Sequence, residues 1–98
     1  MDLTLDNILT PSQEVDSRLF GDELILVPLL DGIGNLDAEL YTMNETGKAI
    51  WSRLDGERPL RTIARELAEE FNTTLGVVEK DLLRLAKELQ RRKMVVIQ

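Results

Sequence analysis

From residue 45 onward, apolar positions recur at the spacing of an α-helix. Three stripes follow one another, and each repeats at intervals of three or four residues. Such spacing places side chains on one face of an amphipathic helix. The pattern predicts three helices, over residues 45–54, 59–71 and about 75–92. The stripes consist of Ile50 and Leu54, then Ile63, Leu67 and Phe71, then Val78, Leu82, Leu85 and Leu89.

Residue types at the expected helix ends support these boundaries. Asn44 is a good N-cap, because its side chain can accept a hydrogen bond from an unpaired backbone N–H of the first turn. Gly56 can adopt the positive φ that ends a helix, so the first helix should stop there. Pro59 suits the first position of the second helix, and the Asn-Thr-Thr run at 72–74 offers a cap for the third.

The first half of the chain lacks this period and is rich in turn residues. Gly21-Asp22 separates two segments, residues 14–20 and 24–28, which fit a β-hairpin. Residues 38–43 are long enough for a third strand that leads into Asn44. The fold class expected is therefore α+β, with a three-stranded antiparallel N-terminal sheet followed by three helices in a winged helix-turn-helix-like arrangement. Residues 94–97 could add a short edge strand or dock on the core.

Length and the N-terminal sequence bound the domain organisation. The 98 residues fit one domain, which we expect to span residues 13–98 behind a loosely held, flexible arm over residues 1–12. The apolar residues of this arm, Leu3, Leu5, Ile8 and Leu9, could still pack against the domain. The N-terminus has neither the basic start nor the apolar run of a secretory signal. No segment approaches the roughly 20 apolar residues needed to cross a bilayer. These features favour a cytoplasmic protein without a membrane partner.

Two residue types that carry much of enzyme chemistry are absent. The chain holds no Cys and no His, which excludes disulfides and thiolate metal sites and removes the commonest general base. The acidic residues Glu66, Glu69 and Glu70 have no spacing that resembles a calcium loop, and a solvated helix face explains them. We therefore expect no catalytic residue, no cofactor and no metal.

Charge is distributed unevenly along the chain. Residues 1–43 hold nine acidic residues and one basic residue, whereas residues 44–98 hold nine acidic and eleven basic residues. The acidic half would suit a docking face for an enzyme. In the third helix a basic stripe lies opposite the apolar one, which indicates either a solvated face or the border of a groove for an acidic or mixed peptide. The stripe consists of Lys80, Arg84, Lys87 and Arg91, with Leu83 beside it.

Several short motifs occur together in this chain. They are Glu23-Leu24-Ile25-Leu26-Val27-Pro28, Tyr41-Thr42-Met43-Asn44-Glu45-Thr46-Gly47, Ile50-Trp51, Leu54-Asp55-Gly56, Ile63, Leu67, Asp81-Leu82 and Leu89. With these motifs at these separations, residues 14–96 resemble the PqqD family of coenzyme PQQ synthesis proteins, which serve as recognition elements for ribosomally synthesised and post-translationally modified peptides (RiPPs).

The resemblance implies a non-catalytic peptide chaperone. Family members bind the leader of a precursor peptide as an added strand beside the third strand, in a groove walled by the third helix. They present it to a modifying enzyme, such as a radical S-adenosylmethionine protein. An exposed edge strand suits this mode, because its unpaired backbone groups can pair with an extended peptide, and it would equally allow a homodimer. The implied peptide-binding residues are Glu39, Leu40, Tyr41, Thr42 and Met43 of the strand and Lys80, Leu83, Arg84 and Lys87 of the helix.

Two other functions compete with peptide binding. A winged-helix regulator would bind nucleic acid through the basic stripe, but DNA readers usually concentrate basic residues, and this chain has a formal net charge of -6. A structural adaptor would hold the subunits of an enzyme complex without touching the peptide. The residues leave open which RiPP pathway is served and which face of the third strand lines the groove.

Overall fold

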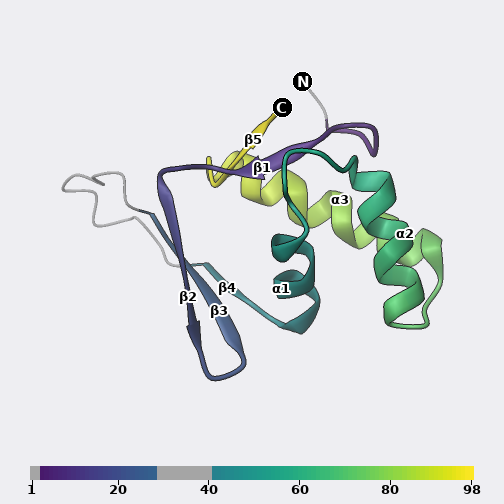
Figure 1. Cartoon of the computed structure of the whole chain (residues 1–98), viewed down its shortest axis with the longest axis horizontal. Helices are drawn as coiled ribbons and strands as arrows, with labels where there is room; N and C mark the ends of the chain where they lie inside the picture. Colours follow the sequence, from purple (N-terminus) through teal and green to yellow (C-terminus); the bar gives the residue numbers. More distant parts are fainter. Residues whose placement is uncertain (1–2, 29–40) are drawn as a thin grey trace.

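The computed structural model describes residues 3–28 and 41–98, and within them the chain forms two small sheets and three helices (Figure 1). In chain order the elements are β1 (Leu9–Pro11), β2 (Val15–Phe20), β3 (Glu23–Pro28), β4 (Tyr41–Met43), α1 (Glu45–Ser52), α2 (Leu60–Glu70), α3 (Leu75–Arg91) and β5 (Val95–Ile97). Strands β2, β3 and β4 form one antiparallel sheet, and the three helices follow it. This confirms the predicted α+β class and the order of its elements.

The three-stranded sheet has the order β2-β3-β4, so β4 is one of its outer strands. Strands β2 and β3 form the predicted hairpin, and residues 41–43 of the predicted third strand pair with β3. Leu24 and Leu26 of β3 are buried and lie opposite Met43 and Tyr41 of β4. Because side chains alternate along a strand, these four lie on the face toward the helices, and the exposed Thr42 lies on the other face.

Helix α1 begins where the sequence predicts. The side chain of Asn44 accepts a hydrogen bond from the backbone N–H of Gly47 at 2.9 Å, as expected for an N-cap. The predicted end at residue 54 was wrong, because the helix ends at Ser52. The N–H of Arg53 bonds to the carbonyl three residues back, which tightens the last turn before Gly56, with φ of 76°, is reached.

Helices α2 and α3 resemble each other at their C-terminal ends, where each is followed by one residue in the left-handed region. These residues are Asn72, with φ of 50°, and Lys93, with φ of 60°. The N–H after Asn72 bonds to the carbonyl of Ala68 at 3.0 Å, and the N–H after Lys93 bonds to the carbonyl of Leu89 at 2.9 Å. These bonds pair carbonyls that a helix end leaves open, so neither helix requires glycine to stop.

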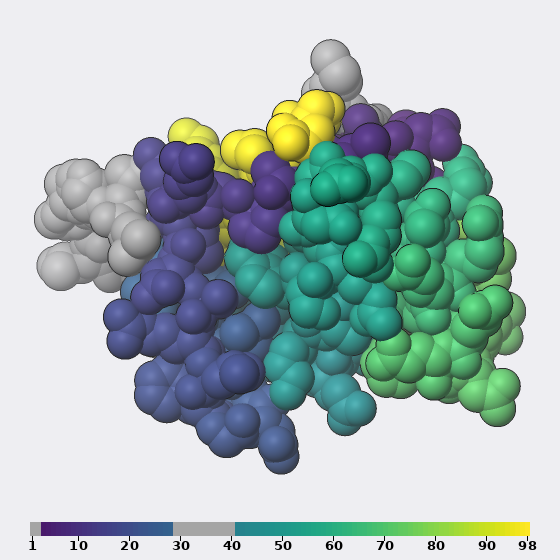
Figure 2. All heavy atoms as spheres, in the orientation of Figure 1, coloured from purple at the N-terminus to yellow at the C-terminus, as the bar shows by residue number. Residues whose placement is uncertain are grey.

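The N-terminal segment differs from the loose arm expected for residues 1–12. Leu3 and Leu9 are buried in the core, and β1 pairs with β5 in a second antiparallel sheet. Figure 2 shows the purple N-terminal segment lying against the yellow C-terminal one. The strand alternative for residues 94–97 is thereby confirmed for residues 95–97.

The start of α2 explains why the N-terminal segment docks. The helix begins at Leu60, one residue later than predicted, and its N-cap Pro59 has no side-chain capping bond. The free N–H groups of Leu60 and Arg61 instead donate to the carbonyls of Asn7 and Leu5, at 3.0 and 2.9 Å. The N-terminal segment therefore caps α2 through its backbone, a role that residue types alone do not reveal.

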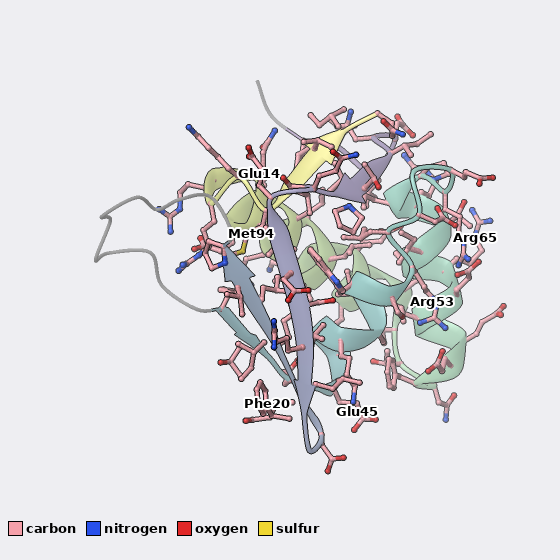
Figure 3. The ribbon with its side chains drawn as sticks, turned by 60° about the vertical axis from the view of Figure 1, so that its left-hand side comes forward. Glu14, Phe20, Glu45, Arg53, Arg65 and Met94 are labelled. Carbon is pink, nitrogen blue, oxygen red and sulfur yellow. The ribbon has the colours of Figure 1, made fainter. Side chains whose placement is uncertain are left out.

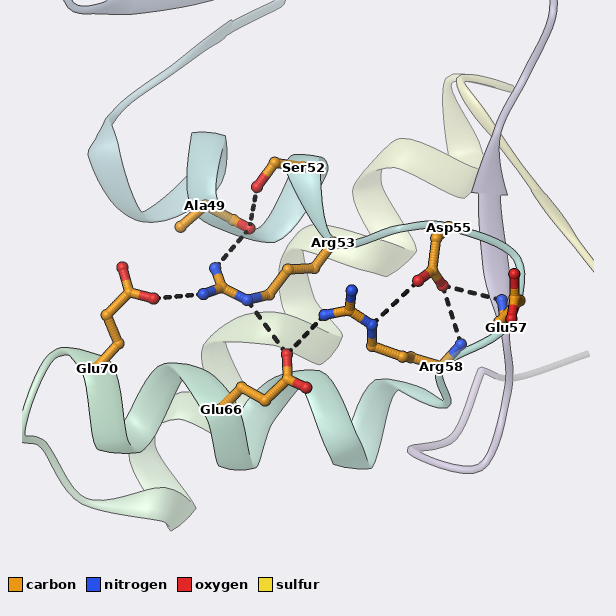
Figure 4. Close-up of polar contacts among 8 residues, drawn as sticks. All are labelled: Ala49, Ser52, Arg53, Asp55, Glu57, Arg58, Glu66 and Glu70. Atoms are coloured by element: carbon orange, nitrogen blue, oxygen red, sulfur yellow. Dashed lines mark hydrogen bonds and ion pairs between the residues drawn. The ribbon is translucent and has the colours of Figure 1, made fainter.

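An ion-pair network fastens α1 and the loop after it to α2. Figure 3 shows Arg53 between these two helices, and Figure 4 shows its contacts. Arg53 contacts Glu66 at 3.2 Å and also pairs with Glu70, both on α2. Arg58 joins Glu66 at 2.8 Å to Asp55 at 3.0 Å. Two of the three acidic residues assigned to a solvated face thus position α1.

One continuous core joins all these elements. Its fully buried side chains come from both sheets and from α2 and α3, and Trp51 packs partly buried at its edge. In the described ranges 3–28 and 41–98, no helix combines the length and apolar character required to traverse a membrane. The largest fully buried side chains are those of Leu9, Leu26, Leu60, Ile63, Leu67, Leu82, Leu89 and Met94.

Candidate functional site

A groove of about 550 Å³ runs between the outer strand β4 and helix α3. The start of α1 closes it on a third side, because the chain passes from β4 directly into that helix. The described residues that line it are Tyr41, Thr42, Met43, Asn44, Thr46, Gly47, Ile50, Asp81, Arg84, Leu85 and Glu88.

The strand side of the groove offers backbone groups. β4 pairs with β3 along one edge, and β3 lies between β2 and β4 in the sheet. Within residues 3–28 and 41–98, no strand pairs with the opposite edge of β4. An outer strand of this kind presents N–H and C=O groups in the direction in which another strand would add.

The helix side presents one face of α3. Asp81, Arg84, Leu85 and Glu88 are spaced at 0, 3, 4 and 7 residues and therefore share that face. Arg84 contacts Asp81 at 3.0 Å, and its side chain is 79% exposed. The wall thus carries both signs of charge around the partly buried Leu85, which suits a peptide of mixed character.

A stacked pair joins β4 to the C-terminal end of α3. The guanidinium of Arg92 lies 4.9 Å from the centre of the Tyr41 ring, within the range of a cation–π contact. Arg92 also donates to Glu88 at 2.6 Å, as does Arg91 at 2.6 Å. Hydrogen bonds from Arg91 and Arg92 hold the pKa of the Glu88 carboxyl below its usual value. Glu88 is therefore a carboxylate at neutral pH.

The floor of the groove is apolar. Met43 and Ile50 are 2% and 3% exposed, and Gly47 of α1 lies against Met43. A Cβ added at Gly47 would stand 3.1 Å from the Cβ of Met43, so glycine permits this close approach of α1 to β4.

A smaller and more apolar pocket continues from the groove. It measures about 270 Å³ and shares Thr46, Ile50 and Asp81 with the groove. Leu67 of α2, Phe71 directly after that helix, and Val77 and Val78 of α3 also line it. The volume suits one large apolar side chain.

The residues that the sequence predicted for peptide binding have different positions in the structure. Tyr41, Thr42, Met43 and Arg84 line one groove, as expected from their assignment to a strand and a helix. Lys80 and Lys87 are exposed but are not among the described lining residues, and Leu83 packs partly buried against the core. Leu83, which the sequence placed beside the basic stripe, is not among the described lining residues either. Glu39 and Leu40 lie outside the described residues.

The sequence analysis missed the groove face of α3. Asp81, Leu85 and Glu88 line the groove with Arg84, whereas the predicted stripe continued from Arg84 to residues 80, 87 and 91. Both rows have helical spacing, so spacing alone does not separate them. Which of the two rows faces the groove depends on how α3 is rotated about its axis relative to β4. Leu85, already assigned to the apolar stripe, was the one signal in the sequence for the row that lines the groove.

The described residues offer no centre for metal chemistry. Over 3–28 and 41–98, no group of three or more Asp, Glu, His or Cys side chains is arranged to hold a metal ion. The groove carboxylates of Asp81 and Glu88 are instead paired with arginines. Its geometry provides hydrogen-bonding groups, charges and apolar surface for a ligand.

A family model described as coenzyme PQQ synthesis protein D (PqqD) matches residues 29–95, well over half of the chain. The chain belongs to the PqqD family. The match spans β4, all three helices and the start of β5, and thus includes every described residue that lines the groove. It confirms the resemblance drawn from the sequence motifs.

Curated relatives point to the same family. Proteins named PqqA binding protein from Xanthomonas oryzae pv. oryzae, among them those of strains PXO99A and KACC10331, are 34% identical to this chain over 53 residues. The aligned part covers 54% of this chain and 58% of the relative. The chain therefore spans a little over half the length of the curated relatives it matches.

Two solved structures share the fold. The Methylobacterium extorquens structure, a PqqD truncation of PqqCD described as a stand-alone RiPP recognition element, has a TM-score of 0.76 at 14% identity. It covers 96% of this chain and 94% of that one. TbiB1 in complex with the TbiA(beta) leader peptide has a TM-score of 0.72 at 22% identity, with 88% and 93% covered. At these identities the likeness concerns the fold.

Proposed function

We propose that this chain is a recognition element that binds the leader of a ribosomally synthesised precursor peptide as an extra strand beside β4. The peptide lies between β4 and α3, with its backbone paired to the outer edge of β4. Strand addition of this kind draws affinity from main-chain hydrogen bonds and selectivity from side-chain pockets. Each added hydrogen bond contributes about 0.5–1.5 kcal/mol net.

The observation that carries the proposal is the position of the groove. It lies beside an outer strand, between that strand and the helix packed next to it, so that a single extended ligand meets both. A groove between two helices would favour a helical ligand, and a closed cavity would favour a small molecule. An extended peptide fits this arrangement best.

The side-chain surfaces of the groove define which peptide fits. Asp81, Arg84 and Glu88 offer both signs of charge along one wall, and the pocket beyond Ile50 is apolar. A leader that carries charged residues facing α3 and one large apolar residue near the start of α1 would satisfy all of these surfaces.

Named relatives support the same ligand class. The Xanthomonas oryzae proteins are named for binding PqqA, and TbiB1 was solved with a leader peptide. For this chain, capture of a leader is the part of their function that the groove can perform. We further propose that the protein presents the bound leader to a partner, a modifying enzyme such as a radical S-adenosylmethionine protein.

The proposed role is one of binding without catalysis. The chain acts without catalysing a reaction itself, because the groove offers binding surfaces and paired charges in place of an activated nucleophile or base.

The location and the oligomeric state are further parts of the proposal. A cytoplasmic location, as expected from the N-terminus, stays a prediction. A homodimer would compete with the peptide if it used the outer edge of β4, so we propose that the peptide-bound form is a monomer.

Nucleic-acid binding has less support than peptide binding. Arg84 of the basic stripe pairs with Asp81, and Arg91 pairs with Glu88. Phosphate recognition requires a concentrated positive surface, and these pairs reduce it. The structural-adaptor alternative leaves the groove without a role.

An N-methyl scan of the leader tests strand addition. The short precursor peptide encoded beside the gene is synthesised with one backbone nitrogen methylated at a time, and its affinity is measured by calorimetry. An added strand points alternate N–H groups toward the sheet edge, so we expect affinity to fall at every second position. Each sensitive position should lose about twofold to tenfold, the equivalent of one net hydrogen bond.

The alternating pattern is its own control, because neighbouring positions carry the same added methyl group. Affinity that is insensitive to every methyl group, or that falls over a run of consecutive positions, would contradict strand addition. Binding of duplex DNA in place of the peptide would support the nucleic-acid alternative.

A further inference from the structure

The end of the β2–β3 hairpin exposes two adjacent apolar side chains. Leu19 is 64% exposed and Phe20 is 58% exposed, the highest values among the large hydrophobic residues that the structure describes. The hairpin runs beside α1, and its turn lies at the end far from β1 and β5 (Figure 1). Figure 3 shows Phe20 near that turn, and alternation places Leu19 on the opposite face of the sheet.

Three carboxylates surround this apolar tip. Asp22 and Glu23 follow it in the chain, and Glu45 opens α1 and lines a hollow together with Asp22. In the described part of the chain, none of the three forms an ion pair. Lys48 of α1 donates to the backbone carbonyl of Asp22 at 3.2 Å, which ties the turn to the helix. The tip is therefore apolar with an acidic border, and it is held in place.

The hollow beside the tip is separate from the peptide groove. It measures about 890 Å³, and none of the residues that line it lines the groove itself, although Phe71 lines both the hollow and the apolar pocket that continues from the groove. Helix α1 divides the two, since it turns Glu45, Lys48 and Ala49 toward the hollow and Thr46 and Ile50 toward the groove. A second macromolecule can therefore sit at the hairpin while a peptide occupies the groove.

We infer that the hairpin tip and the hollow beside α1 form the docking surface for the peptide-modifying enzyme. The inference rests on the proposed function, because a protein that presents a bound peptide needs a second surface for the enzyme that receives it. At the tip, charge complementarity predicts a partner surface with an apolar recess bordered by Lys or Arg. The hollow is also lined by Lys48, Arg53 and Arg58, so it offers charges of both signs. Asp22 and Glu23, two acidic residues of the first half of the chain that do not line the groove, acquire a role in this way.

The test measures enzyme and leader binding separately. The modifying enzyme encoded beside the gene is titrated against leader-loaded protein, as wild type and as the double variant Leu19→Thr and Phe20→Thr. Threonine keeps the strand propensity of β2 while it removes the apolar surface. We expect enzyme affinity to fall at least tenfold and leader affinity to stay unchanged, because the groove is not altered.

A matched control and a charge test sharpen the result. Val96→Thr removes an apolar side chain that is 47% exposed on β5 and should leave enzyme affinity unchanged. The pair Asp22→Asn and Glu23→Gln should weaken enzyme binding at low salt and reduce its dependence on salt.

Each contrary outcome has a distinct meaning. Enzyme affinity that is unchanged in the Leu19/Phe20 variant, or that falls as much in Val96→Thr, overturns the docking surface. A wild-type protein that binds the leader but never the enzyme also overturns it. Failure of the wild-type protein to bind the leader instead contradicts the proposed function, and unchanged leader binding shows that a variant is folded.

Discussion

Asn44 connects the outer strand to the helix that closes the groove. Its side chain caps α1 through a 2.9 Å bond to Gly47 N–H, and it lines the groove itself. We expect Asn44→Ala to lower the free energy of unfolding by about 1 kcal/mol, because one N–H of the first turn loses its acceptor. Urea unfolding checks this. Asn44→Ser keeps an acceptor and should cost clearly less; equal losses for the two variants would contradict the capping role.

Arg84 is the residue of the predicted basic stripe that lines the groove. An exposed charge interaction contributes up to about 1 kcal/mol, so Arg84→Ala should weaken leader binding by about twofold to fivefold. Lys87→Ala removes a charge from the same helix outside the groove lining and should have a smaller effect. Calorimetry with the leader compares them. A larger effect of Lys87→Ala would restore the stripe that the sequence analysis proposed.

At the scale of elements, the close contact of α1 with β4 depends on Gly47. Alanine normally stabilises a helix relative to glycine by roughly 0.5–1 kcal/mol. At Gly47 the added Cβ would stand 3.1 Å from the Cβ of Met43, whereas at Gly76 of α3 it meets nothing within 4 Å. Gly76→Ala should therefore raise the thermal unfolding midpoint more than Gly47→Ala. The reverse order would show that the contact with Met43 relaxes freely.

Among the elements, the helices could be predicted from the sequence, whereas the sheet formed by the two ends of the chain could not. Helical spacing and the Asn44 cap predicted three helices, because those signals are local. The β1–β5 sheet escaped prediction, since it pairs Leu9 with Ile97 from opposite ends of the chain and its strands have only three residues each. The N-terminal segment also caps α2 through its backbone carbonyls, because Pro59 provides no side-chain cap. Residue types in the sequence do not indicate this backbone capping.

The candidate site was predicted only in part for a related reason. The family resemblance implied Tyr41, Thr42 and Met43 as peptide-binding residues, and in the structure these three line the groove. Their role in binding stays a prediction. The helix side requires the rotation of α3 about its axis, which is set by packing of the whole core. Sequence spacing therefore selected the row through Lys80 and Lys87, and the structure brings Asp81 and Glu88 to the groove.

For the whole molecule, stability should fall in acid. Backbone N–H groups of Glu57 and Arg58 hold the pKa of Asp55 below 3.8, and hydrogen bonds from Arg91 and Arg92 hold that of Glu88 below 4.5. A carboxyl with a lowered folded-state pKa contributes stability above its unfolded value and loses it as pH falls through the folded value.

We therefore expect the urea midpoint to be steady near neutral pH and to decline as the pH falls below about 4.5 and onward past 3.8. Asp55→Asn removes one of these two carboxyls with a lowered pKa, so its decline should be shallower than that of the wild type. A midpoint that rises on acidification over this range would contradict the assigned shifts.

Helix α1 divides two surfaces of the molecule, the groove that we propose binds a peptide and the hairpin tip that we propose binds an enzyme. The central claim concerns the groove. Its most direct test is a titration of isotope-labelled protein with the leader peptide encoded beside its gene, in which backbone amide shifts are followed for every residue. We predict that the shifts concentrate at Tyr41–Met43 and along α3 at Asp81, Arg84, Leu85 and Glu88. Saturable shifts confined to other surfaces, or no shifts with this peptide, would contradict the claim.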